Sequence, residues 1–490
     1  MGTVIRNIHN RVDVFQVIPA KIPEGVPFYS IKILDDDMRN LNTVLQNEGN
    51  VLSDDGRIWI SANFVNNNHV YDVKMRVRGD QPNHWENKKK SWRIKFNKND
   101  LFSGMREMNL ILPEDRAWFA ELLNNKRAKD MNLLQPPMRY VAVSINNSRP
   151  MLYLEVEHWT VEMFEKQGRS SNIDMFKQSF LDTFKDISMW DTYIDSNSQN
   201  LHSLESANLL LSIINGDNAR NSSVLSSLID LLFFEEELAL WYAHSLLAGD
   251  GHVVGDNVRL FYDYTLGKFV PVPWDVYLFE PKSITELPIN PLWKTLFASA
   301  EKRLMTHKIL WAYLSDQKRI DEDLQYANEQ REIIESIIYK DTQKYQTNRE
   351  IRKDLNRRME QILANMSSLK EEISTSKAKV SWDTVLESKD ENRRVVSIDV
   401  IAEGPEISSI SKDDSFGDSS FYMDTGNSQY DETDILISED VLLDPIRNEG
   451  NMYRFFIVGP YVTASGSNSL GIKIINSVTG KPATLELLSP

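Results

Sequence analysis

Apolar and polar residues alternate along much of the first third of the chain. The alternation is clear in Phe28–Leu34, Arg57–Ile60 and Tyr71–Val77, and a period of two residues is typical of strands with one buried face. One segment, Asp115–Asn132, has a helical pattern instead. The pattern therefore predicts that residues 1–158 form a twisted sheet with one packed helix.

From about residue 159 to 375 the apolar period becomes helical. A wide apolar stripe covers Leu225–Ala243 and predicts a helix that ends shortly before Asp250. Between Ile351 and Ile373 apolar residues recur at steps of three and four, and Ile333–Ile338 indicates another helix. We expect both helices to pack on this helical region, with a coiled-coil dimer as the alternative.

The helical period stops at Ser374–Ser381, which predicts a linker. Beyond it, short apolar runs separated by Gly, Asn, Asp and Ser predict a β-sandwich-like accessory domain over residues 376–490. The stretch Ser411–Asp434 is rich in Asp, Ser and Gly but lacks regular ligand spacing, so we expect a solvated loop rather than a calcium site. Nothing in this domain selects between a protein and a carbohydrate surface as its partner.

Composition narrows the class of protein. The chain has 490 residues and a net charge of −16, which argues against a general nucleic-acid or anionic-membrane binder. It has no cysteine, so disulfides and thiolate metal sites are excluded. We expect no transmembrane helix, because no apolar run approaches about 18 residues. The first residues lack the features of a signal peptide, so an export route is not visible.

Two acids and an amide flank a predicted hairpin in the helical region. Asp250 and Asn257 precede its first strand, which starts at Val258, and Asp275 follows its second strand. Magnesium prefers oxygen ligands and binds through one or two carboxylates together with phosphates. The pattern favours a metal–nucleotide site, whereas the simpler interpretation is that these residues only form turns.

Five further motifs precede this set in the chain. They are Arg76–Gly79 with Lys89–Phe96, then Leu101–Met105, Asp115–Leu134, Val141–Asn147 and Leu152–Glu157. In this order, and together with the set around Asp250, they resemble the CotH family of spore-coat-type protein kinases over about residues 25–375.

The resemblance implies an α+β, atypical protein-kinase-like fold of two lobes: a strand-rich lobe at 1–158 and a helical lobe at 159–375. It also implies that Lys90 contacts nucleotide phosphates and pairs with Glu157. Asp250 takes the catalytic-base position, and Asn257 and Asp275 become metal ligands. The standard kinase strings for the catalytic and activation loops do not occur in the chain.

Strand alternation provides a check on the lysine. It places Lys90 with Trp92 on the apolar face and Lys89 with Arg93 on the other, which favours Lys90 as the functional lysine. The same alternation places the side chains of Glu155 and Glu157 on one face of their strand, so the choice of Glu157 over Glu155 rests on the motif alone.

The loop that follows Gly79 occupies the place of a phosphate-covering loop. It contains a single glycine where the family usually has Gly-Asn-Ser, so phosphate contact falls to its backbone N–H groups and to Asn83 or His84. Because of this departure, a site with weaker nucleotide affinity remains an alternative.

The sequence thus predicts an ATP- and Mg²⁺-dependent kinase, with Mn²⁺ as an alternative metal, that phosphorylates Ser or Thr of proteins, itself included. A kinase-fold enzyme that transfers a glutamyl or nucleotidyl group is one alternative, because fold does not fix chemistry. A non-catalytic surface or spore-coat assembly protein is another. The resemblance favours a bacterial surface, spore coat or secreted location, and the sequence leaves the oligomeric state open.

Overall fold

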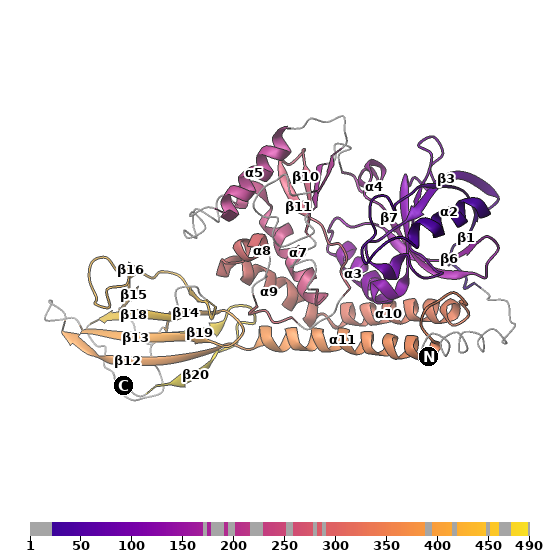
Figure 1. The fold of residues 1–490 in the computed structure, drawn as a ribbon. Helices are drawn as coiled ribbons and strands as arrows, with labels where there is room; N and C mark the ends of the chain where they lie inside the picture. Colours follow the sequence, from indigo (N-terminus) through magenta and orange to yellow (C-terminus); the bar gives the residue numbers. More distant parts are fainter. Residues whose placement is uncertain are drawn as a thin grey trace. The chain divides into compact units, whose positions relative to one another are not determined.

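The computed structural model describes residues 22–169, 174–177, 191–194, 201–215, 229–250, 258–277, 282–286, 291–387, 394–413, 419–446, 451–459 and 472–488. These residues form a mixed α/β structure of helices and several sheets (Figure 1). The chain divides into two compact units. The first contains residues 1–280 and 317–363, and the second contains residues 281–316 and 364–490.

Seven strands of the first unit close into a barrel, drawn in indigo and purple in Figure 1. The order around it is β1-β2-β3-β4-β5-β7-β6, and β1 pairs with β6 in parallel to close it. The sequence predicts a twisted sheet, and this last pairing is what turns the sheet into a barrel. The strands are β1 (Phe28–Ile33), β2 (Ile60–Asn66), β3 (His69–Val77), β4 (Trp92–Lys95), β5 (Glu107–Ile111), β6 (Met138–Ile145) and β7 (Met151–Glu157).

The barrel core is built from the alternate positions of these strands. Tyr29, Phe64, Met75 and Ile94 are completely buried in it. The alternation therefore predicts β1 and β3 correctly. It fails at Arg57–Ile60, where the strand begins only at Ile60 because a turn, closed by a hydrogen bond from the Arg57 N–H to the Asp54 carbonyl, precedes it.

Short helices cover and interrupt the barrel. Helix α2 (Asp35–Leu45) buries Leu41 and Leu45 in the barrel core. The predicted helix at Asp115–Asn132 is divided into the 3-10 turn η3 (Pro113–Arg116) and α3 (Phe119–Asp130). Ala117 and Trp118 have φ of 46° and 61°, and a residue in that region cannot continue a right-handed helix.

A second sheet follows in the order β11-β10-β8-β9. The predicted hairpin is confirmed, since Phe261 pairs with Val270 and Gly267 takes a φ of 66° in its turn. The elements here are α4 (Val161–Lys166), β8 (Asp174–Lys177), β9 (Asp191–Ile194), α5 (Leu201–Asn215), α7 (Glu235–Leu247), β10 (Arg259–Asp263) and β11 (Lys268–Pro271).

The helix predicted over Leu225–Ala243 is interrupted: residues 229–232 are helical, and α7 begins at Glu235. The interruption is local, because Phe233 forms a β-bridge with Phe269 of β11. The helix still ends just before Asp250, as predicted.

Two long helices carry the apolar period predicted after residue 330. They are α10 (Gln317–Ile338) and α11 (Asn348–Ser374). Ile334 of α10 and Ile351, Leu355 and Ile362 of α11 are completely buried by the chain itself. The first of the two interpretations, packing within the chain, accounts for these apolar positions.

The second unit combines helices α8 (Pro291–Leu296) and α9 (Ala300–Ser315) with two sheets, which contribute to one apolar core. The linker prediction at Ser374–Ser381 is wrong, because a strand begins at Lys377 and pairs with the next one. The strands are β12 (Lys377–Glu387), β13 (Arg394–Glu403), β14 (Ser408–Lys412), β15 (Ser420–Met423), β16 (Ile435–Leu436), β17 (Val441–Leu443), β18 (Met452–Gly459), β19 (Ile472–Asn476) and β20 (Thr484–Leu487).

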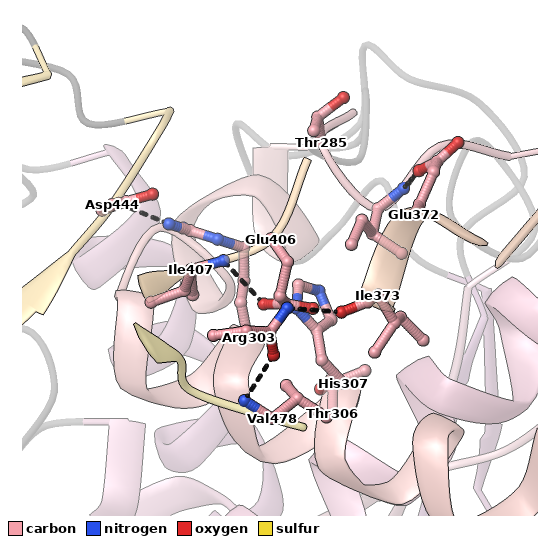
Figure 2. Close-up of polar contacts among 12 residues, drawn as sticks. Thr285, Arg303, Thr306, His307, Glu372, Ile373, Glu406, Ile407, Asp444 and Val478 are labelled. Atoms are coloured by element: carbon pink, nitrogen blue, oxygen red, sulfur yellow. Dashed lines mark hydrogen bonds and ion pairs between the residues drawn. The ribbon is translucent and has the colours of Figure 1, made fainter. Parts of the chain in front are cut away.

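Buried ion pairs join α9 to these strands, as Figure 2 shows. Arg303 Nη2 lies 2.5 Å from Asp444 Oδ2, and His307 Nδ1 lies 2.8 Å from Glu406 Oε1. Because all four side chains are withdrawn from water, removing one partner would leave a buried charge or polar group. Within this unit the helix and the strands are therefore held together as one body.

Candidate functional site

In the loop after β3, the chain turns back so that the ring of His84 lies against Gly79. Gly79 has a φ of 94°, and a Cβ added there would meet the His84 ring at 2.2 Å. His84 belongs to the 3-10 turn η2 (Pro82–His84) and is nearly buried. A side chain at position 79 would therefore push this turn away from the barrel.

Two predicted phosphate-loop residues converge on one carboxylate. Asn83 Nδ2 donates a hydrogen bond of 2.8 Å to Asp115 Oδ1, and His84 Nε2 lies 3.2 Å from the same oxygen. Burial lowers the pKa of His84 to about 4 although Asp115 opposes this shift, so the imidazole is neutral near pH 7. The loop is thereby fastened to η3, the turn that carries Asp115.

Arg116 lies at the centre of a buried group of charges. Its Nε lies 3.3 Å from Asp115 Oδ2 and 3.4 Å from Glu121 Oε2, and its Nη1 contacts Asp275 Oδ1. Its guanidinium also faces the Tyr277 ring at 5.6 Å. The contact with Asp275 joins η3 to the segment that follows the β10–β11 hairpin.

A second arginine adds an unsatisfied donor to this group. Burial, followed by the charge of Arg116, lowers the pKa of Arg78 to about 10, so it keeps its charge at neutral pH. Among the residues that the structure describes, Arg78 Nη1 is buried without a hydrogen-bond partner. A buried cationic donor of this kind is satisfied well by an anionic oxygen.

The backbone around the charged group is strained at three non-glycine residues. Ala117 and Trp118 directly follow Arg116, and Asp275 itself has a φ of 66°. Left-handed conformations at such residues cost about 1–3 kcal/mol each and occur often at functional sites. The strain therefore lies on both sides of the Arg116–Asp275 contact.

Asp250 approaches the same group from the end of α7. It is 1% exposed, and its charge adds to the effect of burial in raising the pKa of Tyr277. Tyr277 is also the ring that Arg116 faces. Asn257, the other predicted metal ligand, lies outside the described residues.

Lys90 and Glu157 are not brought together. Lys90 Nζ donates to the carbonyl oxygens of Trp85 and Asn87 at 2.6 and 2.9 Å, and burial lowers its pKa to about 8. Glu157 Oε1 instead lies 2.6 Å from Lys166 Nζ. The roles that the resemblance gives to Lys90 and Glu157 stay predictions.

The argument that strand alternation separates Lys89 from Lys90 is wrong, because neither lysine lies in a strand. Strand β4 begins only at Trp92, so the two lysines precede it, and both are buried. Lys89 Nζ lies 2.8 Å from Asp341 Oδ2, a partner far away in the sequence. Glu155 also has partners of its own, since it accepts hydrogen bonds from Tyr29 and Arg139.

The structure thus gathers four of the predicted site residues, Gly79, Asn83, His84 and Asp275, around Arg116, with Asp250 close by. Sequence reasoning missed the charges that hold them together. All four missed residues stand in the recognised motifs Arg76–Gly79 and Asp115–Leu134, which offered a signal, whereas nothing in the local pattern marks a contact between residues 116 and 275. The missed residues are Arg78, Asp115, Arg116 and Glu121.

The donor chemistry of the site fits a hard cation bound together with phosphate. No group of three or more metal-ligating side chains occurs within the described part of the chain. Magnesium needs only one or two carboxylates when phosphates and water complete its shell. Asp275 is about one fifth exposed, and its carboxylate is paired with Arg116 in this structure.

Comparison with known proteins gives one family. The model of the family described as CotH kinase protein matches residues 75–378, which include the whole charged group. No curated protein matches the chain. One solved structure, the Shewanella oneidensis MR-1 toxin–antitoxin complex of HipA, HipB and operator DNA, contains a chain with 10% identity and a TM-score of 0.24. The match covers 71% of this chain and 76% of that one, and at this TM-score it carries no argument.

A search of the described helices finds none that is long and apolar enough to cross a membrane.

Proposed function

This chain belongs to the CotH kinase protein family, and from that premise we propose that it is an ATP- and Mg²⁺-dependent protein kinase. It transfers the γ-phosphoryl group to Ser or Thr of proteins, itself included. In this proposal the fold is kinase-like, with the barrel and α3 in one lobe and residues 159–375 in the other.

The observation that carries the proposal is the buried Nη1 of Arg78, which has no hydrogen-bond partner among the described residues. The charge of Arg116 adds to burial in lowering the pKa of Arg78, and the charges of Asp115 and Glu121 only partly oppose this shift. Phosphate oxygens accept hydrogen bonds from guanidinium groups with good geometry. We assign the nucleotide phosphates to these arginines, with Glu121 as the acid that orients them.

Asp275 and Asn257 are the residues that we propose to hold Mg²⁺, or Mn²⁺ in its place. When bound, the metal neutralises charge on the phosphates. Arg116 then shares Asp275 with the metal. The structure leaves room for this sharing, because Asp115 and Glu121 remain as partners of Arg116.

Asp250 is proposed to accept or orient the hydroxyl of the substrate. It is buried at the end of α7, and its charge reaches Tyr277 beside Asp275. Lys90 and Glu157 keep the roles of phosphate contact and lysine orientation only if both exchange their present partners when nucleotide binds.

Transfer of a glutamyl or nucleotidyl group is the second candidate. The observation in its favour is the loop after Gly79, where the His84 ring packs against the glycine and Asn83 is bound to Asp115. A loop fastened in this way differs from a glycine-rich loop that covers nucleotide phosphates, and the fold alone does not fix which group is transferred.

Intact-mass analysis of the purified chain after incubation with ATP and Mg²⁺, with and without glutamate and a protein mixture, tests the proposal. A phosphoryl increment that the variant Asp275→Ala loses supports the kinase. The matched control is Asp55→Ala, an exposed acid in another loop, which should keep full activity. A glutamyl or nucleotidyl increment selects the second candidate, and no increment on any protein favours a non-catalytic assembly protein.

A further inference from the structure

A cavity of about 740 Å³ lies on the outer face of the barrel, against β1, β2, β3 and β4. Lys32, Ser61, Lys74 and Lys95 line it from these four strands. They alternate with residues such as Ile33 and Ile94, whose side chains point into the barrel core. Four residues of that core, Ile33, Ala62, Val73 and Phe96, also border the cavity between the polar side chains. We call this cavity the basic groove.

Positive charge dominates the basic groove. Its lining contains five cationic side chains and one acid, Asp72, which accepts a hydrogen bond of 2.7 Å from Asn63. The whole chain carries a net charge of −16, so this concentration of positive charge is opposite to the composition. The five cations are Lys32, Lys74, Lys95, Lys98 and Arg106.

The chain itself satisfies two of these cations: Lys95 Nζ lies 2.9 Å from Glu107 Oε1, and Lys74 Nζ donates a hydrogen bond of 2.9 Å to Ser61 Oγ. The other three are not satisfied in this way within the described residues, since Lys32 and Lys98 form no ion pair and Arg106 Nη1 is buried without a hydrogen-bond partner. Lys74 and Lys95 stand directly opposite each other on β3 and β4, and Glu107, opposite Lys95 on β5, compensates one of these two like charges. Donor capacity and positive charge therefore remain for a ligand.

The spacing of the cations indicates an extended ligand. Lys32 on β1 and Lys95 on β4 are separated by three strand intervals, or about 14 Å at about 4.8 Å per interval. A single phosphate group is too small to contact both. The only aromatic residue of the lining, Phe96, is 1% exposed and so offers no ring face for a nucleotide base.

We propose that the basic groove binds an acidic polypeptide segment of a partner protein, with Glu and Asp side chains facing the cations. The size suits such a segment, since ligand cavities usually measure about 300–1,000 Å³. Arg76 and Arg93 form the next opposed pair along β3 and β4, on the same outer face, towards Arg78. This inference goes beyond phosphoryl transfer and does not depend on it.

The test is fluorescence anisotropy of the full chain with a labelled peptide of about eight residues, alternating Glu and Ala, long enough to span the groove at about 3.3 Å per residue. The variant Lys32→Gln/Lys98→Gln/Arg106→Gln removes the three unsatisfied cations. The control Lys308→Gln/Lys318→Gln/Lys481→Gln removes the same charge from exposed positions on α9, on α10 and before β20. Thermal unfolding of both variants verifies that they fold.

We expect the groove variant to bind the peptide about tenfold more weakly or worse, the control to bind within about twofold of the parent, and binding to weaken as salt increases. Equal losses in the two variants would show that net charge alone attracts the peptide and would overturn the proposal. Absence of binding at low salt would also overturn it. So would displacement of the peptide by inorganic triphosphate or anionic vesicles at a lower concentration than by unlabelled peptide.

Discussion

Two aspartates of the first unit each bind an arginine, in very different settings. Asp323 of α10 is completely buried, and its oxygens lie 2.7 Å from Arg127 Nε and 3.2 Å from Lys126 Nζ of α3. Asp275 is about one fifth exposed, sits in a left-handed loop conformation and contacts Arg116, which has two further acidic partners.

The difference separates a structural pair from a candidate site. At Asp323 every charge has a partner and water is excluded, so the pair fixes α10 against α3. At Asp275 the charges are shared, the backbone is strained and Arg78 Nη1 nearby has no hydrogen-bond partner among the described residues. Such an arrangement is costly for the folded chain alone, and in our proposal a bound phosphate and cation offset that cost.

The largest effect is expected when the buried pair of Arg127 and Asp323 is broken. Asp323→Ala leaves the fully buried Arg127 guanidinium without its carboxylate, which should lower the free energy of unfolding by about 3–5 kcal/mol. Urea denaturation measures this loss. The double variant Arg127→Met/Asp323→Leu should recover most of it, and a loss below about 1 kcal/mol for Asp323→Ala would show that the pair is not structural.

The next largest effect is the dependence of stability on pH that His84 causes at the candidate site. His84 has a folded pKa of about 4 against about 6.5 when unfolded, so the unfolded chain binds its proton first as pH falls. Stability from this group is present above about pH 6.5 and is lost down to about pH 4, by about 3 kcal/mol at most. We expect His84→Gln to lose less stability than the parent over this window in denaturation at several pH values. Identical pH profiles would contradict the neutral, buried state of His84.

A smaller effect tests whether the loop after Gly79 is held rigidly against His84. Gly79→Ala combines a φ of 94° with a collision against His84, whereas Gly267→Ala has a φ of 66° and nothing within 4 Å. We expect Gly267→Ala to cost about 1–2 kcal/mol and Gly79→Ala clearly more. Thermal unfolding compares the two. Equal costs would mean that the loop yields freely and does not hold His84 in place.

The smallest effect is expected at the exposed charge beside this loop. Arg57 Nη2 lies 2.6 Å from Asp80 Oδ1, but the aspartate is mostly exposed. Arg57→Gln should change the free energy of unfolding by less than about 1 kcal/mol, because water screens such pairs. A larger loss in denaturation would show that exposed charges next to Gly79 contribute to the site as the buried ones do.

The contrast also shows what the sequence can predict. The β10–β11 hairpin and the buried face of α11 follow from local periodicity and one turn glycine, and both predictions are confirmed. The family motifs name Gly79, Asn83, His84 and Asp275, which the structure places around Arg116, and their roles stay predictions. These features depend on neighbours in the chain or on a pattern that survives without knowledge of the fold.

The missed features depend on contacts between distant segments. Nothing near Lys89 indicates that Asp341 is its partner, and nothing near Arg116 indicates Asp275. Closure of the barrel depends in the same way on the parallel pairing of β1 with β6. The predicted helix is broken at Ala117 and Trp118 by their positive φ angles, which helix propensity does not encode.

The most direct test of the account uses Asp275→Asn, which keeps the shape of the side chain and tolerates the left-handed backbone well. Calorimetric titration with ATP, with and without Mg²⁺, is carried out on the parent and the variant, together with thermal unfolding of each. The account predicts that Mg²⁺-dependent ATP binding is lost while the unfolding temperature stays the same or rises. Retained Mg²⁺-dependent binding, together with a drop in stability as large as that of Asp323→Ala, would contradict it and make Asp275 a structural residue.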